Sequence, residues 1–263
     1  MKGFLNMSVI RLNLQKSIGR VLFIVEGGRN EFSLLRRVFC DVLQYEYVEK
    51  RRGRAKWFQS QNVSTSKVAV VNTEESHISY IRDSEDYLDD VFQTLIEEHE
   101  FPVDQSAIYY LFDRDPKSNV QHELLQSLLG ELHDPYENAD GMRGGFLLLS
   151  YPAIESYSVS CFIPDSHLMN FALGADLKEF IANTPRIQIN KISEESLISA
   201  AEAMLACFRD YGLGSSLDDH SGWNERVFSH QEACYAATTK YRLLSLLSMA
   251  FLQLGILEIV DST

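Results

Sequence analysis

The sequence predicts an α/β fold, in which helices cover both faces of a mostly parallel sheet and a helical C-terminal region follows. Two observations predict it. Up to residue 165, short apolar and β-branched runs of strand length alternate with amphipathic stretches of helical spacing. After that point the pattern becomes helical. The 263 residues, of which 45% are hydrophobic, suffice for a substantial core. We therefore expect two regions, residues 1–165 and 166–263.

The elements of the first region follow one another as strand, helix, strand, helix. Strands are expected over 20–25, 67–72, 106–112 and 145–150, and helices over 31–46, 84–98, 119–133 and 153–162. Residues 48–66 interrupt this order as a hairpin or loop, and Asn30 is expected to cap the first helix. In the second region, helices are expected over 167–182, 194–211 and 225–255.

Net charge, cysteine spacing and the apolar stretch near the C-terminus argue against several classes of protein. The formal net charge of -13 argues mildly against a large nucleic-acid footprint, although carboxylates gathered around metal ions would be locally neutralised. The four cysteines are far apart and form no Cys-x-x-Cys pair, and no secretory signal is visible, so we expect a reducing, cytoplasmic location. The apolar stretch 243–260 contains Gln253 and Glu258, which favours a buried helix over a membrane anchor, and no membrane partner is expected.

Acidic residues follow three of the predicted strands. Glu26 comes directly after strand 20–25, Asp113 and Asp115 follow strand 106–112, and Glu155 lies five residues beyond strand 145–150. Parallel strands collect ligands at their carboxyl ends, so we expect these side chains to meet at one edge of the sheet. Glu155 and the two aspartates have ordinary alternatives, because acids are common in first helical turns and in turns before proline. Glu26 is harder to explain in this way, because a capping residue would come later in the chain. The conjunction of these carboxylates favours a site.

Asp113 and Asp115 are two positions apart, which puts both side chains on the same side of an extended chain. Arg114, between them, is expected to face the other side. Oxygen ligands without histidine or cysteine nearby select Mg²⁺ or Mn²⁺. One or two such ions would stabilise the attacking and leaving oxygens of a phosphodiester.

Three stretches resemble the signature blocks of Toprim domains, which have a Rossmann-like fold: "FIVEGGRNE" (23–31), "YYLFDRDP" (109–116) and "LLSYPAIES" (148–156). Together they look closest to the OLD (overcoming lysogenization defect) and RloB-like Toprim proteins of bacterial defence systems, some of which work beside an ABC-type ATPase. The resemblance covers roughly residues 18–165. It implies a Toprim fold and a metal-dependent nuclease activity.

The resemblance also implies roles for individual residues. Glu26 would be a metal ligand or the general acid/base, and Asp113 and Asp115 would hold metal. Glu31 and Glu155 would complete a second metal position, and Ser150 would orient ligands. Where nuclease-type blocks usually have an acidic residue four positions after the first glutamate, this chain has Asn30, so Glu31 would have to reach the site from the next position.

A basic stretch with aromatic neighbours lies in the expected hairpin. It is the candidate nucleic-acid contact, because basic and aromatic side chains together suit phosphates and stacked bases. A solvated surface loop remains the alternative. The residues concerned are Lys50, Arg51, Arg52, Arg54, Lys56 and Trp57.

The leading expectation is a Mg²⁺-dependent Toprim nuclease that cleaves DNA or RNA as an effector of anti-phage defence, with an ABC-type ATPase partner. The alternative is a non-catalytic Toprim-fold scaffold or regulatory subunit that binds such an ATPase. A phosphatase with Asp113 as nucleophile and Asp115 as acid is disfavoured, because Pro116 follows and the motif lies in mid-chain. The sequence does not choose between DNA and RNA, and it leaves a homodimer open.

Overall fold

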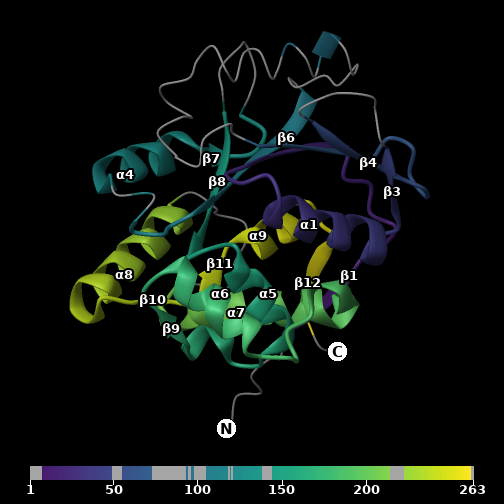
Figure 1. The fold of residues 1–263 in the computed structure, drawn as a ribbon. Coiled ribbons are helices and arrows are strands. Elements are labelled where there is room, and N and C mark those ends of the chain that lie inside the picture. Colours follow the sequence, from purple (N-terminus) through teal and green to yellow (C-terminus); the bar gives the residue numbers. More distant parts are fainter. Residues whose placement is uncertain are drawn as a thin grey trace, which may run out of the picture.

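The computed structural model of the chain describes residues 8–48, 55–72, 93, 96–97, 105–117, 119, 121–137, 144–213 and 222–261. Its strands are β1 (Ser8–Leu12), β2 (Arg20–Val25), β3 (Tyr45–Val48), β4 (Lys56–Ser60), β5 (Lys67–Asn72), β6 (Ser106–Asp113), β7 (His133–Asp134), β8 (Gly145–Tyr151), β9 (Asn170–Phe171), β10 (Tyr241–Arg242), β11 (Leu244–Ser245) and β12 (Leu257–Asp261) (Figure 1). Its helices of a full turn or more include α1 (Asn30–Arg36), a π-helix (Arg37–Val42), α4 (His122–Glu131), α5 (Glu155–Phe162), α6 (Gly174–Ala182), α7 (Glu194–Asp210), α8 (Trp223–Thr238) and α9 (Leu247–Gln253).

The central sheet has the strand order β11-β8-β6-β2-β5-β4-β3. Its four middle strands, β8, β6, β2 and β5, run parallel, whereas β4, β3 and β11 are antiparallel to their neighbours. The parallel strands are buried along almost their whole length, which explains why they read as unbroken apolar runs. The predicted α/β class with a mostly parallel sheet core is confirmed, and the arrangement is compatible with a Rossmann-like fold.

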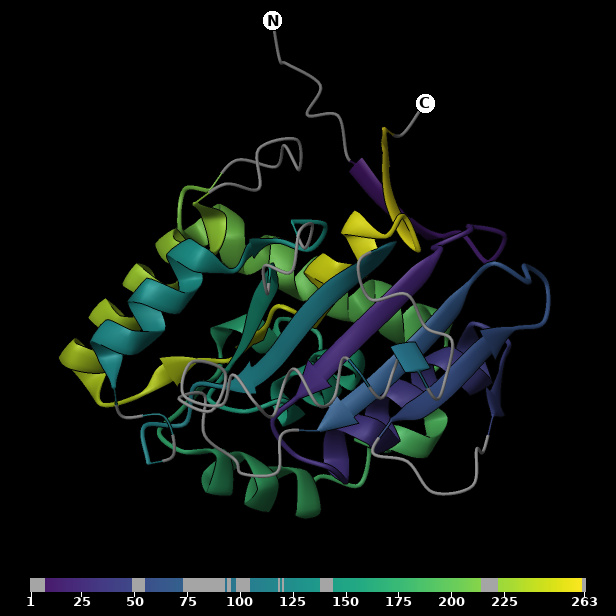
Figure 2. The same cartoon turned by 90° about the horizontal axis from the view of Figure 1, so that it is seen from above.

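The described helices lie mainly on one side of this sheet. In Figure 1, α1, α5, α7 and α9 lie on one side, and α4 and α8 lie beside β8. Figure 2 shows the same sheet from above, with its strands in front of these helices. Of the helix expected over 84–98, the structure describes only residues 93, 96 and 97, which are helical, and the rest of it lies outside the described residues.

The first helix differs from expectation at both ends. After α1 the chain widens into the π-helix, and Gln44, with a φ of 60°, turns it into β3, so residues 45 and 46 are strand and not helix. Asn30 does not cap the helix: its side chain donates to Glu155 instead. The Asn30 amide therefore bonds to the Glu155 carboxylate, and the first turn of α1 has no side-chain cap. The expected hairpin is present, because β3 pairs antiparallel with β4.

The C-terminal region contains strands that the sequence reading missed. The helix expected over 225–255 is broken, because Thr239 takes a left-handed φ of 58° and ends α8. The chain then forms β10, which pairs with β9, and β11, which joins the central sheet beside β8. Residues 257–261 form β12 and pair with β1, so the stretch 243–260 is not one helix. The boundary at residue 165 stays a prediction.

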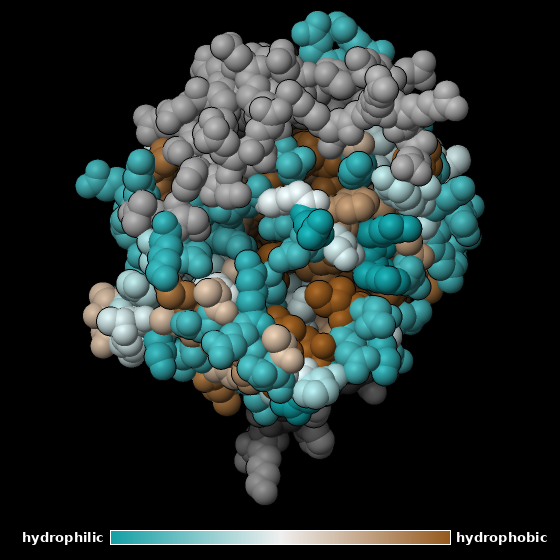
Figure 3. All heavy atoms as spheres, viewed as in Figure 1, coloured by the Kyte–Doolittle hydropathy of each residue, from teal (hydrophilic) through white to brown (hydrophobic). Residues whose placement is uncertain are grey.

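Phe39 anchors the π-helix to the sheet. Its ring lies 5.7 Å from that of Phe58 on β4 and 6.0 Å from that of Phe23 on β2. Aromatic contacts at this spacing add to the burial of the rings and fix their relative orientation. In the coloured part of Figure 3, hydrophilic residues cover most of the surface, and hydrophobic ones show in a hollow near the centre of the view. None of the described helices is long and apolar enough to cross a membrane.

Candidate functional site

The carboxyl ends of β2, β6 and β8 meet at one edge of the sheet, because all three strands run parallel and in register. A cleft of about 470 Å³ opens there. The cleft is lined by Glu26, Gly27, Gly28, Arg29, Asn30, Glu31, Asp113, Asp115, Ala153, Gly174 and Lys178. Four of the five predicted carboxylates therefore lie around one space, and the fifth, Glu155, lines an adjoining pocket of about 200 Å³.

Glu26 bridges two strand ends. Its Oε2 accepts a hydrogen bond of 2.7 Å from the backbone N–H of Asp113, which ties the end of β2 to the end of β6. Asn119 donates from its side chain to Oε1 of Glu26 at 3.4 Å and also to the carbonyl of Asp113. Glu26 itself is only 6% exposed. The carboxylate is therefore held in place before any ligand arrives.

The two aspartates of the "DRD" stretch reach different neighbours. Oδ1 of Asp113 accepts from the backbone N–H of Ile154, just before α5, at 2.7 Å. Oδ2 of Asp115 accepts from the N–H of Gly174 at the start of α6, at 2.9 Å. A Cβ on Gly174 would lie 3.0 Å from the same Asp115 oxygen, so the glycine permits this close approach. Each aspartate thus joins β6 to a different helix.

Glu31 and Gly27 face each other across the turn after β2. A Cβ on Gly27 would lie 2.8 Å and 2.9 Å from the two carboxylate oxygens of Glu31, closer than real contacts allow. Glycine at this position therefore makes room for the Glu31 carboxylate at the cleft. Burial raises the pKa of Glu31, backbone amides oppose the rise, and the charge of Glu155 adds to it.

Glu155 has one engaged and one free carboxylate oxygen. Asn30 donates to Oε1 at 2.9 Å, and the Lys178 ammonium lies 3.6 Å from the same atom. Oε2 is buried and, within the described part of the chain, has no hydrogen-bond partner. A buried carboxylate oxygen without a donor is costly, so it marks a place that a cation or a donor would occupy favourably.

The acidic groups raise one another's pKa. Burial raises the pKa of Glu26 from an ordinary 4.5 to about 7, with the Asp113 amide opposing the rise and the charges of Glu31 and Asp115 adding to it. Burial also lifts the pKa of Asp113 well above its usual range, and the charges of Glu26 and Glu155 reinforce this. Carboxylates crowded in this way favour either protonation or a bound cation.

The residues of the cleft fit a hard divalent ion with few protein ligands. Among the described residues, no three carboxylate, imidazole or thiolate groups are placed to hold one ion together. Mg²⁺, however, is commonly bound by one or two carboxylates, with water and substrate phosphates completing its shell. The oxygen-only donor set and the free Oε2 of Glu155 suit that arrangement.

Three predicted residues lie elsewhere. Ser150 is fully buried, and its hydroxyl hydrogen-bonds with that of Ser245 at 2.9 Å, so it joins β8 to β11 and does not line the cleft. Trp57 is 6% exposed and packs into the core, which leaves no free ring face for a stacked base and corrects that expectation. Lys56, next to it, is exposed. Lys50, Arg51, Arg52 and Arg54 lie outside the described residues.

The structure adds residues that the sequence reading did not single out. Lys178, from α6, brings a positive charge to the cleft, and Asn119 holds Glu26. Lys178 lies 65 residues beyond Asp113 in an ordinary amphipathic helix, so no local signal marked it. Asn119 follows Asp115 by four positions, a turn spacing that local reasoning can detect.

Comparison with known proteins identifies no relative: no family model, curated protein or solved structure matches this chain.

Proposed function

We propose that the chain is a Mg²⁺- or Mn²⁺-dependent nuclease of Toprim type that hydrolyses DNA or RNA phosphodiesters. One observation carries the proposal: carboxylates from the ends of two parallel strands and from the first turn of α1 surround a single cleft at the carboxyl edge of the sheet, and Glu155, from the first turn of α5, lines the adjoining pocket. Ligand sites of parallel α/β sheets lie at this edge. The three sequence blocks that resemble Toprim domains supply the same residues.

Each cleft residue has a role in this mechanism. Asp113 and Asp115 would hold one ion, and Glu31 and Glu155 would hold a second. Such an ion, when bound, would withdraw charge from the phosphodiester and make a water more acidic. Glu26, with a pKa of about 7, can hold or release a proton near neutral pH and would accept one from the attacking water. Lys178 and Arg29 line the cleft and would offset the negative charge that develops on phosphate.

A direct test combines cleavage with metal binding. The purified protein is incubated with labelled single- and double-stranded DNA and RNA in Mg²⁺ or Mn²⁺, and Mn²⁺ binding is measured by calorimetry. We expect cleavage that Asp113→Asn abolishes. Glu123→Gln, which removes an exposed carboxylate on α4, is the matched control and should leave cleavage unchanged. Equal activity in Asp113→Asn and the wild type would refute the assignment of the site.

A non-catalytic scaffold is the second candidate, and one observation favours it. Glu26, Asp113 and Asp115 already accept backbone hydrogen bonds, and within the described residues no three-ligand cluster is formed. On this view the carboxylates hold strand ends together and a protein partner gives the chain its function. Absence of Mn²⁺ binding at millimolar concentration, together with absence of cleavage, would decide for the scaffold.

The biological setting remains a proposal drawn from the resemblance. It comprises an anti-phage defence module, cytoplasmic action and an ABC-type ATPase partner. Co-purification of the chain with the product of an adjacent ATPase gene would test it, and nuclease activity that requires ATP and that partner is the expected outcome.

A further inference from the structure

We propose that the exposed side of α1 and the following π-helix forms a phosphate track, along which a nucleic-acid strand leaves the cleft. The track consists of Arg29, Ser33, Arg36, Arg37 and Cys40. The inference rests on the proposed function, because it names the substrate class of the same cleft and the direction in which that substrate runs.

Helical spacing puts these residues on one side of the chain. They are separated by three or four positions, apart from the adjacent Arg36 and Arg37, and residues at such spacing share a helix face. Arg29, Ser33, Arg36 and Arg37 are exposed, and Cys40 is partly exposed. The intervening residues Leu34 and Leu35 are buried against the core. A continuous polar face therefore starts at the cleft and follows the helix outward.

Two cavities mark the ends of this face. Arg29 lines the carboxylate cleft. Ser33, Arg36 and Arg37 line a second pocket, of about 350 Å³, between the helix and β3. The same helix thus contributes to both cavities, and a chain-like ligand in one would meet the other by following the exposed face.

The charge on this face is opposite to that of the whole protein. The chain carries a formal net charge of -13, yet three arginines lie on the track, and its first exposed acidic residue is Asp41 at the far end. Glu31 belongs to the same helix but is buried at the cleft. A local positive strip on an acidic protein is the electrostatic footprint expected for a phosphate backbone, because distant charges are screened by salt.

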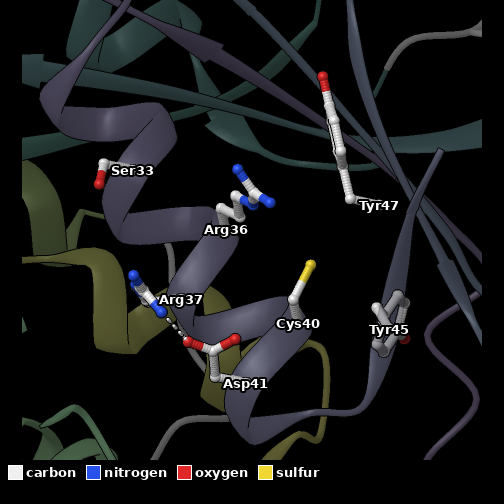
Figure 4. A pocket seen from close by; sticks show the side chains of 7 residues that line it. All are labelled: Ser33, Arg36, Arg37, Cys40, Asp41, Tyr45 and Tyr47. Atoms are coloured by element: carbon white, nitrogen blue, oxygen red, sulfur yellow. Dashed lines mark hydrogen bonds and ion pairs between the residues drawn. The ribbon is translucent and has the colours of Figure 1, made fainter. Parts of the chain in front are cut away.

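Arg36 is already positioned for an anion. Figure 4 shows its side chain directed toward Tyr47, and the guanidinium lies 5.1 Å from the centre of that ring. Within the described residues it has no carboxylate partner. A guanidinium stacked on an aromatic ring keeps its in-plane N–H donors available, which suits bidentate contact with phosphate. Arg37 is different, because Asp41 accepts from it at 2.6 Å.

The distance from Arg29 to Arg36 along the helix corresponds to the length of several nucleotides. From Arg29 to Arg36 the helix rises by roughly 10 Å, at ~1.5 Å per residue. One strand of a B-form duplex carries a phosphate every ~3.4 Å along its axis, so Arg36 would meet a phosphate about three nucleotides from the cleft. The packing of Phe39 against the sheet keeps the helix in place during this contact.

The salt dependence of binding tests the track without requiring cleavage. Binding of a fluorescent single-stranded 12-mer is measured by anisotropy in Ca²⁺ at several salt concentrations. Because one phosphate contact contributes about 0.7 to the slope of log K against log salt for single strands, Arg36→Ala should lower the slope by about that amount and weaken binding several-fold. Arg36→Lys should restore most of the slope, since it keeps the charge.

A matched control separates the track from general charge. Arg226→Ala removes an exposed arginine on α8, outside both cavities, and should leave affinity and slope unchanged. Equal slopes for the wild type and Arg36→Ala, or equal losses in both alanine variants, would overturn the track. So would an absence of oligonucleotide binding by the wild type.

Two further measurements distinguish the track from a small-anion site and separate it from the proposed nuclease activity. Inorganic phosphate is added as competitor: displacement of the 12-mer at micromolar phosphate would indicate a small-anion site and overturn the track. Hydrolysis of bis-p-nitrophenyl phosphate by the wild type in Mn²⁺ tests the proposed function separately. Loss of slope in Arg36→Ala without hydrolysis would keep the track and reject the nuclease, whereas hydrolysis with an unchanged slope would do the reverse.

Discussion

Replacing Glu232 by glutamine would leave the Arg114 guanidinium as a poorly compensated charge beneath the cleft. Arg114 lies between the two aspartates and faces away from them, as expected from its position. Its Nε and Nη2 donate to the two carboxylate oxygens of Glu232 on α8, each at 2.9 Å. Nη1 donates to the carbonyl of Asn119 at 2.7 Å, and the rings of Phe228 and Tyr241 flank the guanidinium.

The burial of this pair sets the size of the effect. The Arg114 side chain is 5% exposed and that of Glu232 is 17% exposed. Breaking a buried ion pair by removing one partner costs about 3–5 kcal/mol, because the remaining charge has no compensation. Glutamine keeps one acceptor oxygen and water can approach Glu232, so we expect the lower end, about 3 kcal/mol. At about 2–4 °C per kcal/mol for a chain of this size, Tm should fall by about 6–12 °C.

The assay is thermal and urea unfolding of Glu232→Gln, followed by circular dichroism. Asp41→Asn is the control, because it breaks an ion pair whose side chains are 44% and 45% exposed, and it should cost less than about 0.5 kcal/mol. The double variant Arg114→Met, Glu232→Leu should recover much of the lost stability, since no buried charge remains. A cost below about 1 kcal/mol for Glu232→Gln would refute the reasoning, because it would mean that the Arg114 charge is solvated.

Three further predictions concern the cleft. The pKa of Glu26 is higher in the folded protein than in the unfolded chain, so its contribution to stability is complete below pH 4.5 and is lost as the pH rises to about 7. Unfolding experiments without metal should show this loss of stability with rising pH. In Glu26→Gln this pH dependence should disappear. At pH 8, Mn²⁺ should therefore raise Tm more than at pH 5. Gly27→Ala, whose Cβ would meet both oxygens of Glu31, should weaken Mn²⁺ binding about tenfold by calorimetry, a change that displaced ligands typically produce. Lys178→Met should lower kcat by about 10²-fold, while unchanged kcat would remove the lysine from the charge-stabilising role.

The strands of the sheet and their acidic ends could be predicted because each depends on a local pattern. A parallel strand is buried on both faces, so "RVLFIV" and "SAIYYLF" are visible as unbroken apolar runs, and the residue after each run marks the edge of the sheet. The gathering of Glu26 and Asp113 follows from this topology. The metal, the nuclease activity and the partners depend on chemistry that the strand pattern does not encode, and they stay predictions.

The parts that could not be predicted depend on contacts between distant residues. Thr239 is a β-branched residue in a left-handed conformation, and the hydrophobic periodicity of the sequence does not indicate that α8 ends there. Ser150 lies near the end of β8, as Asp113 lies at the end of β6, but β11 returns from the C-terminal region and its Ser245 hydroxyl bonds to that of Ser150. Trp57 follows a basic run, yet it lies within β4 and its ring is buried in the core, as is that of Phe58. In each case a tertiary neighbour decided the role.

The carboxylates of the cleft also hold its walls together, which links stability to chemistry. Glu26 accepts from β6, Asp113 accepts from the residue before α5, and Asp115 accepts from the start of α6. A substitution that removes one of these acceptor oxygens leaves the backbone N–H that it paired without a partner, at a cost of about 1–3 kcal/mol where the N–H is buried. Asparagine keeps a carbonyl oxygen for the amide of Ile154, whereas alanine does not. Asp113→Asn therefore removes the charge that a metal needs while the wall stays in place, and a loss of activity in Asp113→Ala alone would report on the wall as much as on the chemistry.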